Sequence, residues 1–322
     1  MKPVLIVNNL WWPFGAHLIH MKWAYIYALI NGYDIFYKYN NNPVFPNGSI
    51  EYYYEKISTI DENEFEGRTQ IIYNRTGIEH NLNIRGHFVP KEYKDAHEFH
   101  STILKSIYKP NEYTQNIIDN NYLLQDLKRE NKKYIALHIR LGDKVNGASK
   151  ESQYIPLQKY FDRCKEIKRK YNLNTIVVCS DTTDGLDEII KINNGEFELL
   201  FNDEQRSRNI WSESLVQKVL SGYDNRDELE KEYLNCFVNY DLLLNAQIIV
   251  GNWDSGFCLV PVEIRNNKID VNVCENQPLW GIREKKRLIA SSSPPIFPPI
   301  TSIFPPITSI FSHRRRNITR FI

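Results

Sequence analysis

Short apolar runs alternate with amphipathic segments at the start of the chain. Val4–Val7 is continuously apolar, as in a parallel strand that is buried on both faces. Apolar residues from Ala16 to Ile30 recur at three- and four-residue spacing, which predicts a helix, and Asn31-Gly32 is a typical helix end. Tyr33–Tyr39 reads as the next strand. This order of strand, helix and strand predicts a βαβ unit with a parallel sheet.

A second series of strands and helices follows a weakly patterned stretch from about residue 40 to 100. That stretch contains alternating segments such as Gln70–Tyr73, and residues 110–131 look helical. The predicted strands of the second series are Lys133–Ile139, Thr175–Cys179, Phe197–Phe201 and Gln247–Val250. The predicted helices are Pro156–Tyr171, Thr183–Ile192, Glu230–Asn245 and Cys258–Arg265, the last of which we expect Pro261 to shorten.

Two such series predict an α/β fold class with two Rossmann-like halves and a cleft between them. We place an N-terminal domain at residues 1–125 and a C-terminal domain at 126–285. The remaining tail, 286–322, repeats Pro-Pro-Ile units and ends in basic residues. Repeated Pro-Pro pairs cannot continue a helix or a central strand, so we predict a disordered or loosely attached tail. Contact of its Ile, Phe and Arg residues with a membrane surface is the alternative.

Composition excludes several classes of protein. Forty Lys and Arg residues face 39 Asp and Glu residues, a net charge of +1, which argues against a dedicated nucleic-acid binder. The five cysteines form no CxxC pair, which excludes a zinc ribbon and a thioredoxin motif and favours free buried thiols in a reducing compartment. No apolar stretch approaches the ~18 residues of a membrane span, and the N-terminus lacks a signal-peptide core, so we expect a cytoplasmic protein.

The candidate chemistry lies where predicted strands end, because ligands of open α/β sheets bind outside the carboxyl ends of the strands. After the strand Lys133–Ile139 come Arg140, Asp143 and Lys144, and His138 shares one strand face with Arg140. A guanidinium fixed there can hold a phosphate through two N–H bonds. An Arg140–Asp143 salt bridge without any ligand is the alternative.

Two further strands end in polar residues. Ser180-Asp181 follows Thr175–Cys179, and Asp181 taken alone predicts the N-cap of the next helix. Asp254-Ser255-Gly256 follows Gln247–Val250 and predicts a turn and a helix start, which suits a phosphate. The chain has neither a Gly-x-Gly-x-x-Gly motif after a strand nor a P-loop, which disfavours a dehydrogenase and a P-loop kinase.

These three segments resemble motifs of the GDP-fucose-dependent fucosyltransferases. His138-x-Arg140-x-x-Asp143-Lys144-Val145 resembles their first motif, in the form found in the α1,6-fucosyltransferases and the nodulation fucosyltransferase. Ser180-Asp181 resembles the second motif, a strand that ends in Thr-Asp-Asp. The run Leu242–Cys258 resembles the third, a strand followed by Ser-Ser-Gln-Val-Cys. The motifs occur in the family's order and spacing over about residues 130–266.

The resemblance implies a GT-B fold and an inverting, metal-independent transfer of fucose from GDP-fucose to a hydroxyl of a glycan or glycoprotein. It implies no cofactor beyond the donor substrate. The motif arginine of the family binds the β-phosphate, a role that falls to Arg140. The position of His138 lies beside the guanine, and Ser255 falls on the family's serine near the phosphate. The chain also has no clear Asp-x-Asp metal motif next to a strand.

The chain departs from the family at several positions. The second family arginine is Leu141, and the base glutamate of the α1,6 enzymes corresponds to Ala148, with Glu151 nearby. The aspartate that reads guanine falls on Asn239 without a gap, or on Asp241 with a gap of two residues. The candidate catalytic residues are Arg140, Asp143, Lys144 and Glu151. The candidate residues for GDP-sugar binding are His138, Arg140, Asp181, Asn239, Asp241, Asp254, Ser255 and Gly256. The candidate residues for the acceptor are His17 and His20.

Alternatives remain open at the level of function and of single residues. A glycosyltransferase that uses another nucleotide sugar is permitted by Leu141 and Asn239, and an inactive nucleotide- or glycan-binding homologue by Ala148. His17 and His20 suit a metal pair, an acceptor contact or simple packing of a helix face. Trp11-Trp12 suits either stacking on a sugar or core packing.

Overall fold

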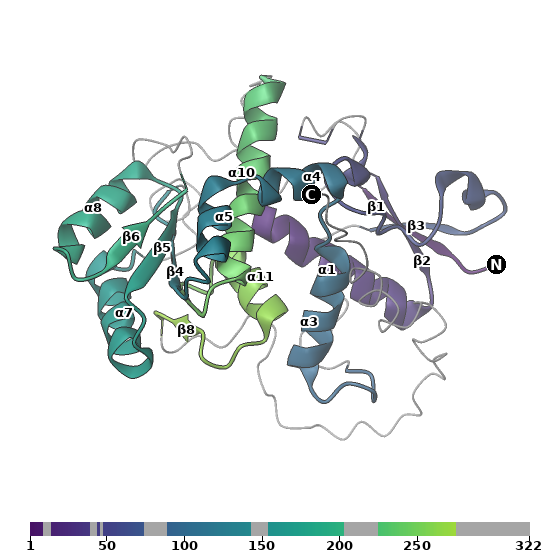
Figure 1. Ribbon diagram of the computed structural model, residues 1–322. Helices are drawn as coiled ribbons and strands as arrows, with labels where there is room; N and C mark the ends of the chain where they lie inside the picture. The colour runs from purple at the N-terminus through teal and green to yellow at the C-terminus, as the bar shows by residue number, and fades with distance from the viewer. Residues whose placement is uncertain are drawn as a thin grey trace, which may run out of the picture. The chain divides into compact units, whose positions relative to one another are not determined.

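The computed structural model describes residues 1–8, 14–38, 44–45, 48–73, 89–142, 154–202 and 225–274. These residues form two parallel β-sheets with helices packed against them, so the predicted α/β fold class is confirmed (Figure 1). Met1–Lys285 pack as one compact unit. The predicted tail lies outside the described residues, and the predicted boundary near residue 125 stays a prediction.

The N-terminal sheet has the strand order β2-β1-β3, with β1 (Val4–Asn8) between β2 (Asp34–Lys38) and β3 (Gln70–Ile72). Helix α1 (Phe14–Asn31) connects β1 to β2 and begins two residues before the prediction. It ends at the predicted cap, because Gly32 has φ +67° and the Tyr33 N–H donates to the Ala28 carbonyl at 2.8 Å. This Schellman arrangement needs a residue that tolerates the left-handed region, which glycine does.

The C-terminal sheet has the order β6-β5-β4-β7-β8 and is parallel throughout. The strands β4 (Ile135–Ile139), β5 (Thr175–Ser180) and β7 (Ile248–Gly251) match predicted apolar runs, and β6 (Glu198–Leu200) is shorter than predicted. The two-residue strand β8 (Val271–Asn272) was not predicted.

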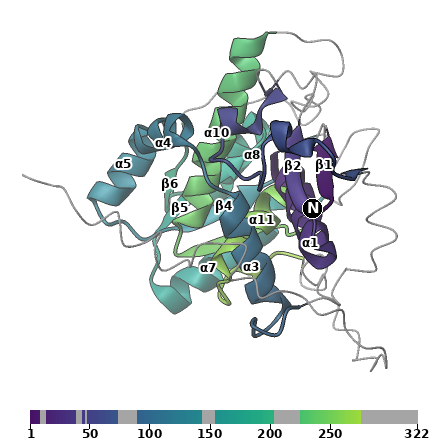
Figure 2. The same cartoon turned by 90° about the vertical axis from the view of Figure 1, so that its right-hand side faces the viewer.

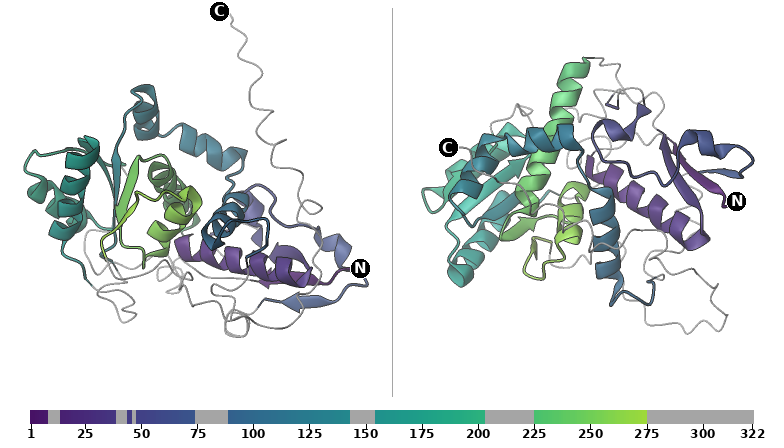
Figure 3. Two further views of the ribbon diagram at one scale, coloured as in Figure 1. Left: turned by 90° about the horizontal axis from the view of Figure 1, so that it is seen from below. Right: turned by 45° about the vertical axis from the view of Figure 1, so that its right-hand side comes forward.

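Helices cover both faces of the C-terminal sheet. Helices α7 (Leu157–Tyr171) and α8 (Thr183–Asn193) pack on the face to which Ile135, Leu137 and Ile139 point. Helices α5 (Tyr122–Arg129), α10 (Arg226–Leu244) and α11 (Gly256–Arg265) pack on the face of Tyr134 and Ala136 (Figure 3, left). Burial on both faces explains why the central strands are continuously apolar.

Three helix predictions differ from the structure. Residues 110–131 form two helices, α4 (Glu112–Asp119) and α5, because Asn111 and Asn121 each cap a separate helix with their side chains. Helix α3 (Ala96–Ile107) falls in the weakly patterned stretch, as do the short 3-10 segments η2 (Ile50–Tyr52) and η3 (Glu62–Phe65). Pro261 does not shorten α11, which continues to Arg265.

The helices α1, α3 and α11 contact one another and join the two sheets (Figure 2). Lys22 on α1 and Glu263 on α11 form an ion pair of 2.6 Å between Nζ and Oε2, with side chains 1% and 0% exposed. The Ser101 hydroxyl on α3 donates to the Ile264 carbonyl at 2.8 Å. A buried ion pair is costly to break, because each charge would remain in a medium of low polarity.

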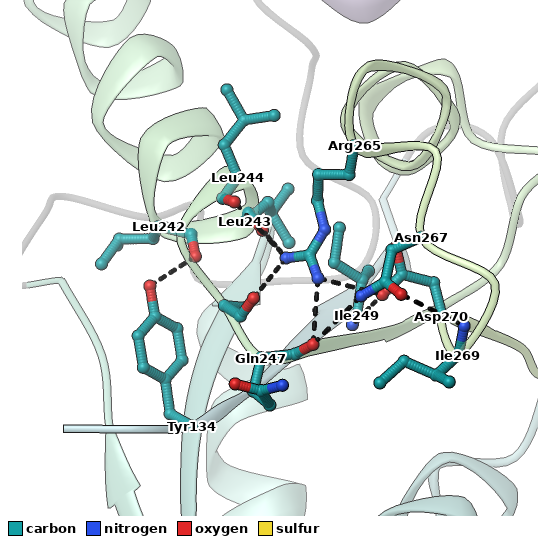
Figure 4. Close-up of polar contacts among 11 residues, drawn as sticks. Tyr134, Leu242, Leu243, Leu244, Gln247, Ile249, Arg265, Asn267, Ile269 and Asp270 are labelled. Carbon is teal, nitrogen blue, oxygen red and sulfur yellow. Dashed lines mark hydrogen bonds and ion pairs between the residues drawn. The ribbon is translucent and has the colours of Figure 1, made fainter. Parts of the chain in front are cut away.

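A cluster of polar contacts around Arg265 joins α10, α11 and β7 at the amino end of the strands (Figure 4). The Arg265 guanidinium donates to three backbone carbonyls at 2.6–3.0 Å, those of Leu243, Ala246 and Gln247. It also contacts Asp270, whose carboxylate accepts the Ile249 N–H at 2.8 Å. Carbonyls that the end of α10 leaves without helical partners are thereby satisfied.

We predict that removing either partner of the Lys22–Glu263 pair destabilises the protein strongly. Lys22→Met or Glu263→Gln should lower the free energy of unfolding in urea by about 3–5 kcal/mol, because one buried charge loses its partner. The double variant Lys22→Met/Glu263→Leu should recover most of that loss.

The matched control is the exposed pair Lys56–Asp61, with side chains 47% and 61% exposed. Lys56→Met should cost less than about 1 kcal/mol. Equal losses at the buried and exposed pairs would contradict the assignment.

Candidate functional site

Arg140 stands at the carboxyl end of β4, beside the end of β5. Ile139 pairs with Ser180 across the two strands, so Arg140 and Asp181 are the next residues on each. Arg140 Nη1 donates to Asp181 Oδ2 at 2.6 Å, and the two side chains are 21% and 18% exposed. The guanidinium is therefore held in a fixed place while part of its surface reaches solvent.

Asp181 also holds the backbone that follows β4. Its carboxylate accepts the N–H groups of Leu141 and Gly142, each at 2.9 Å. A Cβ at Gly142 would lie 2.7 Å from Asp181 Oδ2, so a larger residue here would have to displace the carboxylate. The prediction of Asp181 as an N-cap is wrong: Thr182 caps α8, with its hydroxyl accepting the Gly185 N–H at 3.2 Å.

His138 lies in β4 with 5% exposure and stacks on Phe257 of α11, the ring centroids being 5.4 Å apart at 17°. Burial lowers the pKa of His138 to about 4; Asp181 opposes that shift and Arg140 adds to it. The imidazole is therefore neutral at pH 7. Its Nδ1 has no hydrogen-bond partner among the described residues.

The start of α11 lies at the same strand edge as Arg140. Strand β7, which leads into α11, pairs with β4 so that His138 lies opposite Gly251. Ser255 occupies the N-cap position, but its side chain caps no N–H. Within the described parts of the chain, the N–H groups of Gly256 and Phe257 have no acceptor. Such a helix start attracts negative charge.

The start of α1 meets the start of α11 backbone to backbone. A Cβ at Gly15 would lie 2.4 Å from the carbonyl carbon of Gly256 and 2.4 Å from the Phe257 nitrogen. The ring of Phe14 packs edge-on against Tyr240, the centroids being 4.7 Å apart. The N-terminal half thus reaches the strand edge that carries Arg140.

The two histidines predicted for the acceptor are buried in α1. His17 is 1% exposed and His20 5% exposed. The Nδ1 atom of His17 lies 3.3 Å from the hydroxyl of Tyr233, and burial, with the neighbouring His20, lowers the pKa of His17 to about 3. These positions match the packing interpretation, and a role in acceptor binding stays a prediction.

The two residues considered for reading guanine lie on α10. Asn239 is half-buried there. The Asp241 carboxylate accepts the Asn245 side-chain amide at 2.8 Å, and burial raises its pKa to about 6, with a contribution from Asp119. Because Asp119 belongs to α4, the Asp241 carboxylate lies near that helix. Asp254 lies in the loop before α11, its N–H donating to the Asn252 side chain at 3.0 Å.

Several predicted residues lie outside the described ranges, namely Asp143, Lys144, Glu151, Ala148, Trp11 and Trp12. Their roles stay predictions. Leu141, which replaces the second family arginine, is 2% exposed and belongs to the core of the sheet. Position 141 is therefore a packing position in this chain.

Gly142 and Phe257 contribute to the site but were not predicted. The sequence feature that could have identified Gly142 is the presence of a glycine two residues after the arginine at the strand end. Among the residues that the structure describes, no group of three or more His, Cys, Asp or Glu residues is placed to hold a metal ion. No helix in those ranges is both long and apolar enough to span a membrane.

Comparisons with known proteins give a likeness in structure only. Neither models of protein families nor curated proteins match the chain. The NodZ α-1,6-fucosyltransferase soaked with GDP-fucose aligns at 12% identity over 82% of this chain and 93% of its own, with a TM-score of 0.49. The fucosyltransferase NodZ from Bradyrhizobium aligns at 13% over 81% and 92%, with a TM-score of 0.47.

POFUT1 in complex with GDP aligns at 10% identity over 82% of this chain and 96% of its own, with a TM-score of 0.42. Since each of these TM-scores lies below 0.5, the function proposed below rests on the residues of this chain.

We predict that Asp181 stabilises the strand edge as well as orienting Arg140. Asp181→Ala should lower the free energy of unfolding by about 2–3 kcal/mol, because two N–H groups and a guanidinium lose their acceptor. The exposed Asp187→Ala on α8 should change it by less than about 0.5 kcal/mol. Equal effects of the two variants in urea denaturation would contradict this role.

We predict that His138 makes stability depend on pH. The folded-state pKa of about 4 lies below the ordinary 6.5, so the unfolded chain binds the proton more tightly. The stability that this residue contributes is present above pH 6.5 and is lost as pH falls toward 4.

The stability difference between wild type and His138→Gln should therefore shrink by about 1–2 kcal/mol from pH 7 to pH 5. Asp241 and Asp270, whose pKa values burial raises to about 6, shift stability in the opposite direction in both proteins. Their contribution cancels in the difference. A difference that does not change with pH would show that His138 titrates normally.

Proposed function

We propose that the chain is a glycosyltransferase that transfers fucose from GDP-fucose, with inversion and without a metal ion, to a hydroxyl of a glycan or glycoprotein. One observation carries the proposal. Arg140, held by Asp181 at the end of β4, shares a strand edge with the start of α11, whose first N–H groups have no acceptor among the described residues. A fixed cation beside a helix start is a site for a diphosphate.

The chemistry of the donor explains the need for this arrangement. Breaking the bond between fucose C1 and the phosphate oxygen leaves negative charge on the diphosphate. Arg140, which Asp181 holds in place before the reaction, stabilises that charge more in the transition state than in the bound substrate. Ser255 and the N–H groups of Gly256 and Phe257 add hydrogen-bond donors at the helix start. Lys144 is proposed as a second cation.

The remaining roles follow the motif resemblance. The neutral His138, stacked on Phe257, is proposed to lie beside the guanine, with Asn239 or Asp241 as the second guanine contact. The acceptor hydroxyl enters from the N-terminal half. A carboxylate, Glu151 or Asp143, takes its proton while the oxygen attacks C1.

A second candidate function is a glycosyltransferase that uses another nucleotide sugar. The observation that favours it is the core position of Leu141, which leaves the site one cation short of the family motif. The third hypothesis is an inactive nucleotide- or glycan-binding homologue, because Ala148 stands where the resembling α1,6 enzymes have the glutamate that acts as base.

The first test is the melting temperature with GDP, UDP and ADP, each with and without EDTA. A ligand that binds only the folded state adds ~2.7 kcal/mol at a hundredfold excess over its dissociation constant. We expect a shift that is selective for GDP, survives EDTA and is lost in Arg140→Ala. Arg129→Ala, on the exposed face of α5, should keep it.

The outcomes of this experiment distinguish the three functional hypotheses. A shift with UDP but not with GDP favours another nucleotide sugar, and no shift with any nucleotide refutes a nucleotide site at this edge. Turnover of GDP-fucose in an acceptor screen distinguishes an enzyme from an inactive homologue. Equal transfer rates in wild type, Arg140→Ala and Arg140→Lys would refute the role of Arg140.

A further inference from the structure

Three residues from distant parts of the sequence meet on the surface of the protein. Tyr52 ends η2, Tyr113 lies in the first turn of α4, and Glu230 lies near the start of α10. Both tyrosine hydroxyls donate to Glu230 Oε1, at 3.0 Å from Tyr52 and 2.7 Å from Tyr113. The tyrosines are 36% and 43% exposed. We propose that these three residues, the tyrosine platform, bind a sugar unit of an oligosaccharide.

The platform is held rigidly from behind. The Tyr52 ring packs edge-on against Tyr53, the centroids being 4.8 Å apart, and Tyr53 is fully buried against Tyr233 of α10. The Asn111 side chain, which begins α4, donates to the Glu51 and Tyr52 carbonyls at 2.7 and 2.9 Å. Binding to a surface that is already ordered costs little conformational entropy.

The exposed groups match the chemistry of a pyranose. A sugar ring offers a flat face of C–H groups, which packs on an aromatic ring, and hydroxyls that donate to a carboxylate. Glu230 Oε1 accepts both phenols, and Oε2 makes no hydrogen bond or ion pair with any residue that the structure describes. That oxygen is an acceptor for a sugar hydroxyl beside the rings. Hydrogen bonding to Glu230, with burial, raises the pKa of Tyr113 to about 12, so the phenol keeps its proton.

The ring geometry argues against the other ligand that tyrosines and a carboxylate attract, a quaternary ammonium ion. A cation between two ring faces lies up to about 6 Å from each centroid, which needs rings that stand well apart. The centroids of Tyr52 and Tyr113 are 5.8 Å apart in an edge-to-face contact. The rings therefore touch each other and leave no gap for an ammonium group.

The platform is connected to the acceptor side of the candidate site. Glu230 lies three residues before Tyr233 on α10, and the Tyr233 hydroxyl lies 3.3 Å from His17 Nδ1. Tyr233 also packs against Phe14, at the start of α1. The inference that the bound oligosaccharide is the acceptor rests on the proposed function, whereas sugar binding by the platform does not.

The test is isothermal titration of the full chain with cellotetraose and with chitotetraose. We expect binding of at least one of them, weakened about tenfold or more in Tyr113→Ala, which corresponds to ~1.4 kcal/mol. Tyr113→Phe, which keeps the ring, should weaken binding less than Tyr113→Ala, and Glu230→Gln should weaken it through loss of the carboxylate. Tyr122→Ala removes an equally exposed tyrosine on α5, 50% exposed, and should have no effect.

A second readout keeps folding separate from binding. Tyr113→Ala should retain the wild-type melting curve within a few degrees and any melting shift with GDP, because it lies outside the nucleotide edge. If GDP gives no shift but tetrasaccharide binding still depends on Tyr113, the proposed function fails and the platform stands.

Three results would overturn the proposal. The first is the absence of heat with both tetrasaccharides in the wild type. The second is tetrasaccharide binding that Tyr113→Ala leaves unchanged. The third is binding of tetramethylammonium, without sugar binding, that Tyr113→Ala abolishes, which would make the surface a cation site.

Discussion

The two halves of this protein are joined by a buried ion pair between Lys22 and Glu263. Lys22 leaves water when α1 packs against α11, and Glu263 is the acid that it meets there, both side chains being almost fully buried. Removing one partner while the helices stay packed would leave an uncompensated charge in a medium of low polarity. The starts of the same two helices approach each other at Gly15 and Gly256, so this pair also helps to hold α1 against the start of α11. That part of the candidate site is therefore supported by an ion pair that belongs to neither sheet.

Two arginine clusters occupy opposite ends of the C-terminal sheet and differ in exposure. Arg265 lies at the amino end, and its side chain is 9% exposed. Its guanidinium donates hydrogen bonds to backbone carbonyls and contacts Asp270. Arg140 lies at the carboxyl end, is 21% exposed, and is oriented by Asp181. The contacts of Arg265 hold α10, α11 and β7 together. Arg140 has the fixed position and the access to solvent that an anion site requires.

Much of the fold could be predicted from the sequence, because the central strands are buried on both faces and read as continuous apolar runs. Helix α3 could not, since its buried side includes His100 and Ser101, which hide the apolar period. At the site, the strand-end rule identified Arg140 and the start of α11. The contact of Arg140 with Asp181 was missed, because it arises from the pairing of β4 with β5, and local sequence does not reveal which strands are neighbours. Asp143 lies outside the described residues, so its predicted contact with Arg140 stays a prediction.

The contact between Gly15 and Gly256 has a thermodynamic consequence. With no side chain between the two helix starts, a shift of α1 toward α11 would displace the Gly256–Phe257 peptide at the start of that helix. A ligand that moves α1 then alters affinity at α11, and by linkage a ligand at α11 alters affinity at α1 by the same factor. Under the proposed function, donor and acceptor would therefore bind with coupled affinities.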